Sequence, residues 1–119
     1  MNSVELQKRT KFLAAKVIDF VERLPRNYSC EVIGKQLIRS ATSVAANYRA
    51  AGRARSKADF TNKLGIVEEK ADETLFWFEM LLEAKKINET EAKDLVEEVK
   101  EIVAIFSAAH KTARINRGK

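Results

Sequence analysis

Clustered acids and one histidine are the first side chains in this sequence that could do chemistry. Glu68, Glu69, Asp72 and Glu73 lie within six residues of one another. Carboxylates on a helical bundle can hold metal ions when Glu-x-x-His motifs on other helices complete the ligand set. The single histidine, His110, lies in no such motif. We therefore interpret the acids as a solvated face or as ion-pair partners of other helices, and we expect no metal site.

Other catalytic signatures are missing from the sequence. It has no glycine-rich phosphate loop, no nucleophile elbow and no histidine placed beside a plausible nucleophile. Cys30 is the only cysteine, so neither an intrachain disulfide nor a cysteine-cluster metal site can form, and a reducing compartment fits. The sequence predicts a protein that is not an enzyme and needs no cofactor. A nuclease that uses carboxylates and a metal is the enzymatic alternative.

Basic side chains form the second chemically active set, and they gather in three segments. The chain of 119 residues has a net charge of +5 and a pI near 9.4. Residues 1–12, 47–64 and 107–119 hold twelve basic and two acidic residues, a net +10, whereas the remainder holds ten basic and fifteen acidic, a net −5. A surface so charged attracts polyanions, because each neutralised phosphate releases counterions. The predicted nucleic-acid-binding residues are Arg49, Arg53, Arg55, Lys57, Lys63, Lys111, Arg114 and Arg117.

The alternative explanation of these charges is the helix dipole, which favours basic residues near helix C-termini by about 0.3–1 kcal/mol each. It accounts for Arg49, Arg53, Lys111 and Arg114. It does not account for basic residues expected near helix starts, namely Lys8, Arg9, Lys11, Lys57 and Lys63. Base-specific recognition is less expected than recognition of backbone or shape, because Tyr48 and Phe60 are predicted to lie on apolar faces, away from bases that could stack on them.

Four stretches of helical periodicity must position these side chains. Apolar residues recur at spacings of three, four and seven along Leu6–Leu24, Ile33–Ala51, Phe60–Leu82 and Leu95–Ala109. Ser3, Ser56 and Asn88 are the expected caps of the first, third and fourth helices, and the second helix should run from about Cys30 to about Gly52. The sequence predicts an all-α fold, an up-and-down antiparallel four-helix bundle in a single domain, residues 1–119. This topology would bring the three basic segments to one end.

One part of the third helix is apolar on nearly every side. Within Leu75–Leu82, the extra apolar side chains Phe76, Trp77 and Met80 either cover neighbouring helices or form the interface of a homo-oligomer, and Trp favours the interface. Ser40 and its polar neighbours on the second helix would need partners if buried, for which we expect Glu69 or Glu73. No apolar run is long enough to span a membrane and the N-terminus is unlike a signal peptide, so we expect a cytoplasmic protein.

A family resemblance rests on the second and third helices. The segment Arg39–Ala51, with Ser43-Val44-Ala45-Ala46-Asn47 at its centre, precedes the basic turn Arg53–Lys57 and the stretch Lys63–Glu73. Together they resemble the bacterial four-helix bundle proteins called 23S rRNA intervening-sequence proteins, and the resemblance covers essentially the whole chain. These proteins are similar to the accessory proteins of diversity-generating retroelements, which form pentameric barrels and bind nucleic acid and a reverse transcriptase.

The resemblance implies a homopentamer, a reverse transcriptase as a possible partner, and structural roles for Ser43 and Asn47. It also implies a nucleic-acid-facing role for Arg49, Arg53, Arg55 and Lys57. The overall prediction is a non-enzymatic nucleic-acid-binding accessory protein, with RNA favoured over DNA. The alternative is a structural oligomer or adaptor that binds another protein.

Overall fold

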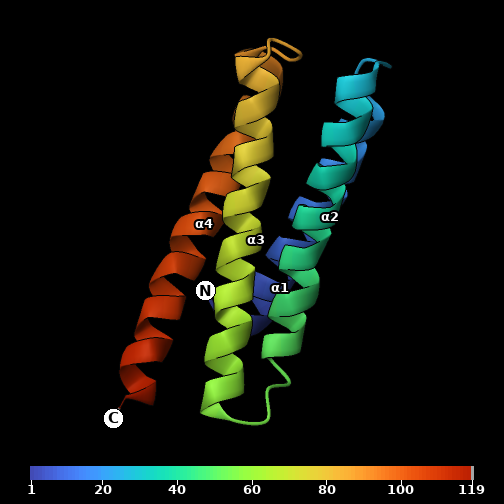
Figure 1. The fold of residues 1–119 in the computed structure, drawn as a ribbon. Helices are drawn as coiled ribbons and strands as arrows, with labels where there is room; N and C mark the ends of the chain where they lie inside the picture. Colours follow the sequence, from blue (N-terminus) through green and yellow to red (C-terminus); the bar gives the residue numbers. More distant parts are fainter. Residues whose placement is uncertain (119) are drawn as a thin grey trace.

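Four antiparallel helices make up the fold, confirming the predicted all-α four-helix bundle. The computed structural model describes residues 1–118, in which the helices are α1 (Ser3–Glu22), α2 (Tyr28–Ala51), α3 (Lys57–Glu83) and α4 (Glu89–Arg117). Figure 1 shows successive helices running in opposite directions through short connections. The bundle measures 49 × 24 × 21 Å. Of the four pairs of neighbouring helices, α1 and α4 have the smallest contact.

Each helix begins at a polar cap, although one predicted cap was wrong. Asn2, Asn27, Ser56 and Asn88 each accept a hydrogen bond from the backbone N–H three residues later. In α1 and α4 a glutamate side chain returns the bond, which completes a capping box. Ser3 was the expected cap of α1, but it is already the first helical residue. Caps of this kind contribute about 1 kcal/mol each, so the helix starts are well defined.

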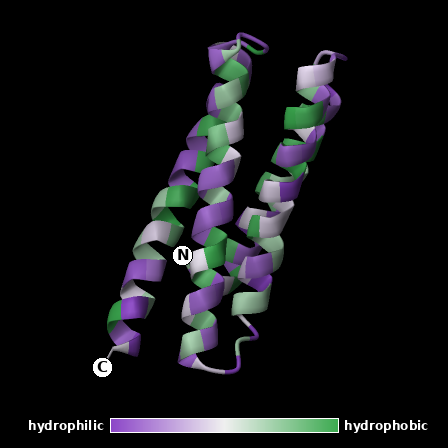
Figure 2. Cartoon of the chain, in the orientation of Figure 1, coloured by the Kyte–Doolittle hydropathy of each residue, from purple (hydrophilic) through white to green (hydrophobic). Residues whose placement is uncertain are grey.

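Aromatic side chains fill the centre of the bundle. Phe78 and Phe106 are fully buried; the Phe78 ring centroid lies 5.3 Å from that of Phe20, and the Phe106 centroid lies 5.0 Å from that of Tyr48. The prediction that Tyr48 faces the core is confirmed, and its hydroxyl lies 3.2 Å from the Ser3 hydroxyl. Figure 2 shows apolar residues recurring along α2, α3 and α4, as expected of helices that each bury one face.

The polar residues of α2 find partners other than the predicted glutamates. The buried hydroxyls of Ser40 and Thr74 lie 2.8 Å apart, and each is also within reach of a backbone carbonyl of its own helix. Asn47 donates its side-chain amide to the hydroxyl and carbonyl of Ser43, both at 2.9 Å. The expectation that Glu69 or Glu73 would satisfy this group was therefore wrong. Short hydroxyl side chains bond their own helix backbone before a longer acid can reach them.

None of the helices described has an apolar stretch that would let it cross a membrane.

Candidate nucleic-acid interface

The basic segments gather towards one end of the bundle. Figure 1 shows the connection between α2 and α3 at the same end as the C-terminal turns of α4, while the N-terminus lies part of the way up the bundle. The start of α1 reaches the last turn of α2, where the Ser3 hydroxyl lies 3.2 Å from the Tyr48 hydroxyl. We call this end, with its predicted binding residues, the basic end. Its members are Arg49, Arg53, Arg55, Lys57, Lys63, Lys111, Arg114 and Arg117.

The side chains of the basic end are free of ion pairs. All but the half-buried Lys63 are exposed, and none of the eight forms an ion pair within residues 1–118. Asp59 is the acid of the segment; its backbone N–H bonds the Ser56 hydroxyl at 3.0 Å and its carboxylate accepts from the Arg55 N–H at 3.3 Å. Lys57 is the first residue of α3, where the helix dipole opposes a positive charge.

Arg9 is held in an ion pair, which removes it from the expected grouping of the start of α1 with the other basic segments. Lys8 and Lys11 of the same segment are exposed and form no ion pair within residues 1–118. The Arg9 guanidinium donates to both carboxylate oxygens of Glu98 at 2.7 and 2.8 Å, and to Glu101 at 3.2 Å. These hydrogen bonds lower the pKa of Glu98 and raise that of Arg9. This half-buried, bidentate ion pair joins α1 to α4, and it neutralises the Arg9 charge that a ligand would otherwise contact.

A histidine and a glutamate make a second link, between α3 and α4, close to the basic end. His110 Nδ1 lies 2.7 Å from Glu68 Oε1, and this bond is the main cause of the lowered pKa of Glu68, to which Ser107 and Arg114 also contribute. Gly65 makes room for the imidazole, because a Cβ there would lie 3.1 Å from the ring. Glu68 is thus a partner for another helix, as predicted for the acidic cluster.

In the rest of the acidic cluster, Glu73 has partners on its own helix, and Glu69 and Asp72 are exposed. Glu73 pairs with Lys70 at 3.4 Å and accepts from the Trp77 indole at 3.4 Å. Among residues 1–118, no three His, Cys, Asp or Glu side chains are placed to hold a metal ion together.

Phe60 lies on the predicted side of α3 but is not buried there, so it adds an exposed apolar side chain to the basic end. It lies seven residues before Val67 and eighteen before Phe78, so it shares their side of α3, yet it is 39% exposed whereas they are fully buried. The cause is its place in the first turn of α3, at the end that α1 does not reach in Figure 1. Periodicity predicts the side of a helix on which a residue lies, but not where neighbouring helices stop.

The extra apolar side chains of α3 differ in their exposure. Trp77 is half-buried and packs against the core of its own bundle, while Phe76 and Met80 are 47% and 36% exposed. Phe76 also meets the Trp77 ring edge-on, with centroids 5.0 Å apart. An exposed pair of large apolar side chains beside an aromatic ring is a plain candidate for a protein contact.

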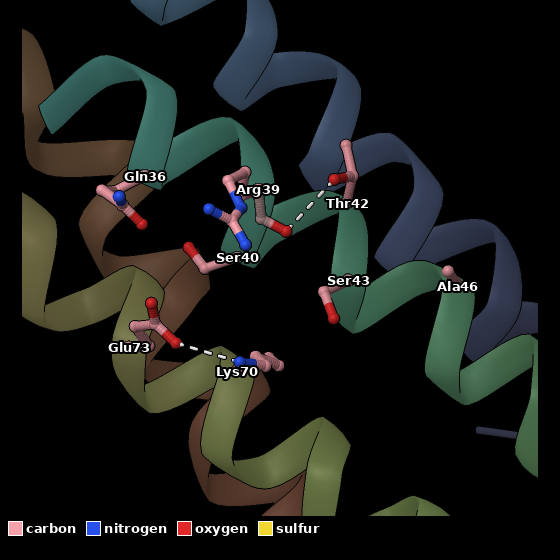
Figure 3. A pocket seen from close by; sticks show the side chains of 8 residues that line it. All are labelled: Gln36, Arg39, Ser40, Thr42, Ser43, Ala46, Lys70 and Glu73. Carbon is pink, nitrogen blue, oxygen red and sulfur yellow. Dashed lines mark hydrogen bonds and ion pairs between the residues drawn. The ribbon is translucent and has the colours of Figure 1, made fainter. Parts of the chain in front are cut away.

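An open polar cleft between α2 and α3 is the site that periodicity and charge counts missed. It encloses about 460 Å³ and is lined by Gln36, Arg39, Ser40, Thr42, Ser43, Ala46, Lys70 and Glu73. Figure 3 shows Arg39 on its α2 wall and the Lys70–Glu73 ion pair on its α3 wall. No buried side-chain nitrogen or oxygen of the described residues lacks a partner. The cleft therefore has no unsatisfied group that calls for a ligand.

Fold and surface together define a class: an antiparallel four-helix bundle whose side-chain pairs link helices and whose one end carries unpaired positive charge. The chain belongs to the 23S rRNA-intervening sequence protein family, whose model matches residues 2–108. The resemblance found on the second and third helices is thereby confirmed at the level of the family.

A solved structure shares this architecture over nearly its whole length. It is a protein of unknown function from the S23 ribosomal protein family of Bacteroides thetaiotaomicron, 29% identical to this chain. The match covers 93% of this chain and 99% of the other, with a TM-score of 0.83. No curated protein sequence matches significantly.

Proposed function

We propose that this protein is a non-enzymatic accessory protein that binds nucleic acid, RNA in preference, through the basic end. The observation that carries the proposal is the gathering, at one end of the bundle, of cations without ion pairs in the described part of the chain. Eight predicted binding residues form no ion pair within residues 1–118, whereas Arg9 is held by two carboxylates. Unpaired exposed cations can each contact a phosphate without first breaking an internal bond.

The helix dipole does not explain the whole basic end. Arg49 lies in the last turn of α2 and Arg114 and Arg117 in the last turn of α4, where the dipole stabilises positive charge. Lys57 opens α3, where the dipole has the opposite sign, and Lys63 follows within two turns. Positive charge at an unfavourable helix start supports a role in binding an anionic ligand.

Charge reversal in the α2–α3 connection is the direct test. Arg53, Arg55 and Lys57 would be replaced together by Glu, and binding of a labelled RNA oligonucleotide measured by fluorescence anisotropy over a series of salt concentrations. We expect wild-type binding to weaken steeply with salt and the variant to lose binding at low salt. The fold should persist, because all three side chains are exposed and Glu is favourable at the first position of a helix.

A matched control reverses the same number of charges elsewhere. Arg26, Lys86 and Lys93 are exposed and lie towards the opposite end of the bundle. Their replacement by Glu changes the net charge by the same amount. It should weaken binding only modestly, because the three residues lie far from the basic end. Equal losses in the two variants, or unchanged binding in the first, would reject the basic end as the binding site.

The proposal includes self-association through α3, for which Phe76 and Met80 supply the observation. Both are exposed on the same helix, one turn apart, with Trp77 between them. Homo-oligomer interfaces are enriched in such aromatic and Met side chains. The homopentamer and the reverse-transcriptase partner implied by the family resemblance belong to this proposal. A structural oligomer or adaptor that binds another protein would use the same face.

Light scattering tests the oligomer independently of nucleic acid. Wild type should have a multiple of the 13.5 kDa chain mass, and the double replacement Phe76→Glu and Met80→Glu should reduce it to the monomer. Tyr28→Glu changes a side chain that is 83% exposed on α2 and serves as the control. A monomeric wild type would refute self-association.

A further inference from the structure

Phe60 is the one aromatic side chain of the basic end that reaches solvent. It is 39% exposed in the first turns of α3, whereas Tyr48, the other aromatic residue of this region, is buried. An apolar side chain cannot bind a phosphate or read the hydrogen-bonding edge of a base. Its ring can only offer a surface for apolar contact or stacking.

Basic side chains bracket this ring along the helix. Lys57 and Lys63 lie three residues before and three residues after Phe60, which makes both of them neighbours of Phe60 on the surface of α3. Arg53 and Arg55 precede it in the α2–α3 connection. Neither lysine forms an ion pair within the described part of the chain. The arrangement is an aromatic face between two phosphate-binding charges.

Single-stranded nucleic acid is the ligand that can use both the Phe60 ring and the lysines beside it. In a duplex each base face is covered by the next base pair, so a duplex would contact the charges and leave Phe60 unused. An unpaired strand exposes its base faces, and proteins that bind single strands combine a basic groove with aromatic side chains on which bases stack. A protein partner would need acidic groups on both sides of an apolar one, and is an outcome that the test below separates.

We propose that the basic end binds unpaired RNA or DNA, with one base stacked on Phe60 and the adjoining phosphates held by Lys57 and Lys63. This inference rests on the proposed function, since it names the form of nucleic acid that the same surface takes. It also corrects the expectation that this surface lacks an aromatic residue for stacking. Recognition remains tolerant of sequence, because every base has a face that can stack.

The experiment compares three ligands of equal length by fluorescence anisotropy: a single-stranded RNA, its duplex, and an abasic strand with the same backbone. Phe60→Leu keeps an apolar side chain but removes the aromatic face. It should weaken binding of the single strand by at least about 5-fold, the lower limit for loss of one stacked base, and leave duplex and abasic strand unchanged. The salt slope should stay the same, because no phosphate contact is lost.

Two further variants keep the result interpretable. Phe60→Trp retains an aromatic face and should bind the single strand at least as tightly as wild type, which separates stacking from a general effect on α3. Phe12→Leu removes another exposed ring, 63% exposed on α1 with the Lys16 ammonium 4.7 Å from its centroid, and should change nothing.

Several outcomes would overturn the inference. Unchanged single-strand binding by Phe60→Leu, or an equal loss for all three ligands, would show that Phe60 does not stack on a base. These outcomes leave the proposed function intact, because wild type still binds. A wild type that binds none of the three ligands would instead reject the proposed function, and the stacking site with it.

Discussion

Positive side chains serve two different purposes in this molecule, and Arg9 and the basic end illustrate them. Arg9 is half-buried, donates from its Nε and Nη2 atoms to two carboxylates of α4, and holds α1 against that helix. Arg53 and Arg55, in the α2–α3 connection, are exposed and form no ion pair within residues 1–118. The same residue type is a structural element in one place and an available charge in the other.

The difference shows that a candidate surface is marked by unpaired charges gathered in one place, more than by net charge. Removing a paired charge should lower stability and leave nucleic-acid binding intact, and removing an unpaired charge of the basic end should do the reverse. Each prediction below measures both quantities, so that a variant with the wrong combination breaks the distinction.

The largest effect is expected from neutralising the α4 part of the basic end, which tests whether it acts with the α2–α3 connection. Lys111, Arg114 and Arg117 would be replaced together by Gln. If each contacts one phosphate of a single strand, the salt slope falls by about 2 and the affinity at 0.1 M salt falls by about 100-fold. Thermal unfolding should change little, since all three are exposed.

The control for that variant neutralises three exposed lysines further from the basic end, Lys86, Lys93 and Lys100. Anisotropy titrations should give it nearly the wild-type salt slope. These lysines form no ion pair within residues 1–118 either, so they differ from the α4 residues only in position. A slope that falls as much as in the α4 variant would mean that binding follows net charge and does not depend on the basic end.

A smaller effect, on stability, is expected at the link between α3 and α4. Gly65→Ala should gain about 1 kcal/mol of helix propensity but crowd the His110 ring, at a cost of about 2 kcal/mol, because that ring is held by Glu68. The net loss is about 1 kcal/mol in wild type. In a His110→Ala background the same change should stabilise by about 1 kcal/mol.

Urea unfolding of the four proteins in this cycle measures the coupling, which should be about 2 kcal/mol. RNA affinity should stay near the wild-type value in the Gly65→Ala variant, because His110 is a packing residue beside the basic end. A coupling near zero would show that the imidazole moves aside freely and is not held by Glu68.

The sequence predicted the architecture well because the four apolar stripes, the turn residues and the caps at Ser56 and Asn88 all specify the same helices. It predicted Ser3 as the cap of α1, one residue after the observed cap, Asn2. It could not predict that Arg9 would reach Glu98, 89 residues away in the chain, because that contact depends on how α1 and α4 are aligned.

The candidate site was predictable only in part, because the sequence does not show how the helices are aligned along the bundle. The charges of the basic end follow from composition and topology, since helices joined by short turns must alternate in direction. The exposure of Phe60 does not, because it depends on where α1 begins relative to the start of α3. The polar cleft beside Arg39 and Ser43 could have been suggested by the run of small polar residues on α2, which leaves space between two helices.

The smallest effect is expected from Arg9→Met, which removes the paired charge and keeps an apolar stem. At pH 7 the variant should be less stable than wild type by about 1 kcal/mol, as measured by urea unfolding, because Glu98 loses its partner. Glu98 has a pKa below its ordinary 4.5 in the folded protein, so its ionised form is favoured by folding. That stabilisation is present above the ordinary pKa and is lost as the pH falls through the lowered one.

The difference between wild type and Arg9→Met should therefore shrink below about pH 4 and vanish once Glu98 is protonated in both folded proteins. Arg49→Met is the matched control from the basic end: it should change stability by less than about 0.5 kcal/mol at either pH, yet weaken RNA binding. A stability loss in Arg9→Met that is the same at pH 7 and pH 3 would mean that its stem, and not its charge, holds α1 to α4. Weakened RNA binding in Arg9→Met as large as in Arg49→Met would place Arg9 in the interface after all and end the distinction between the two groups of charge.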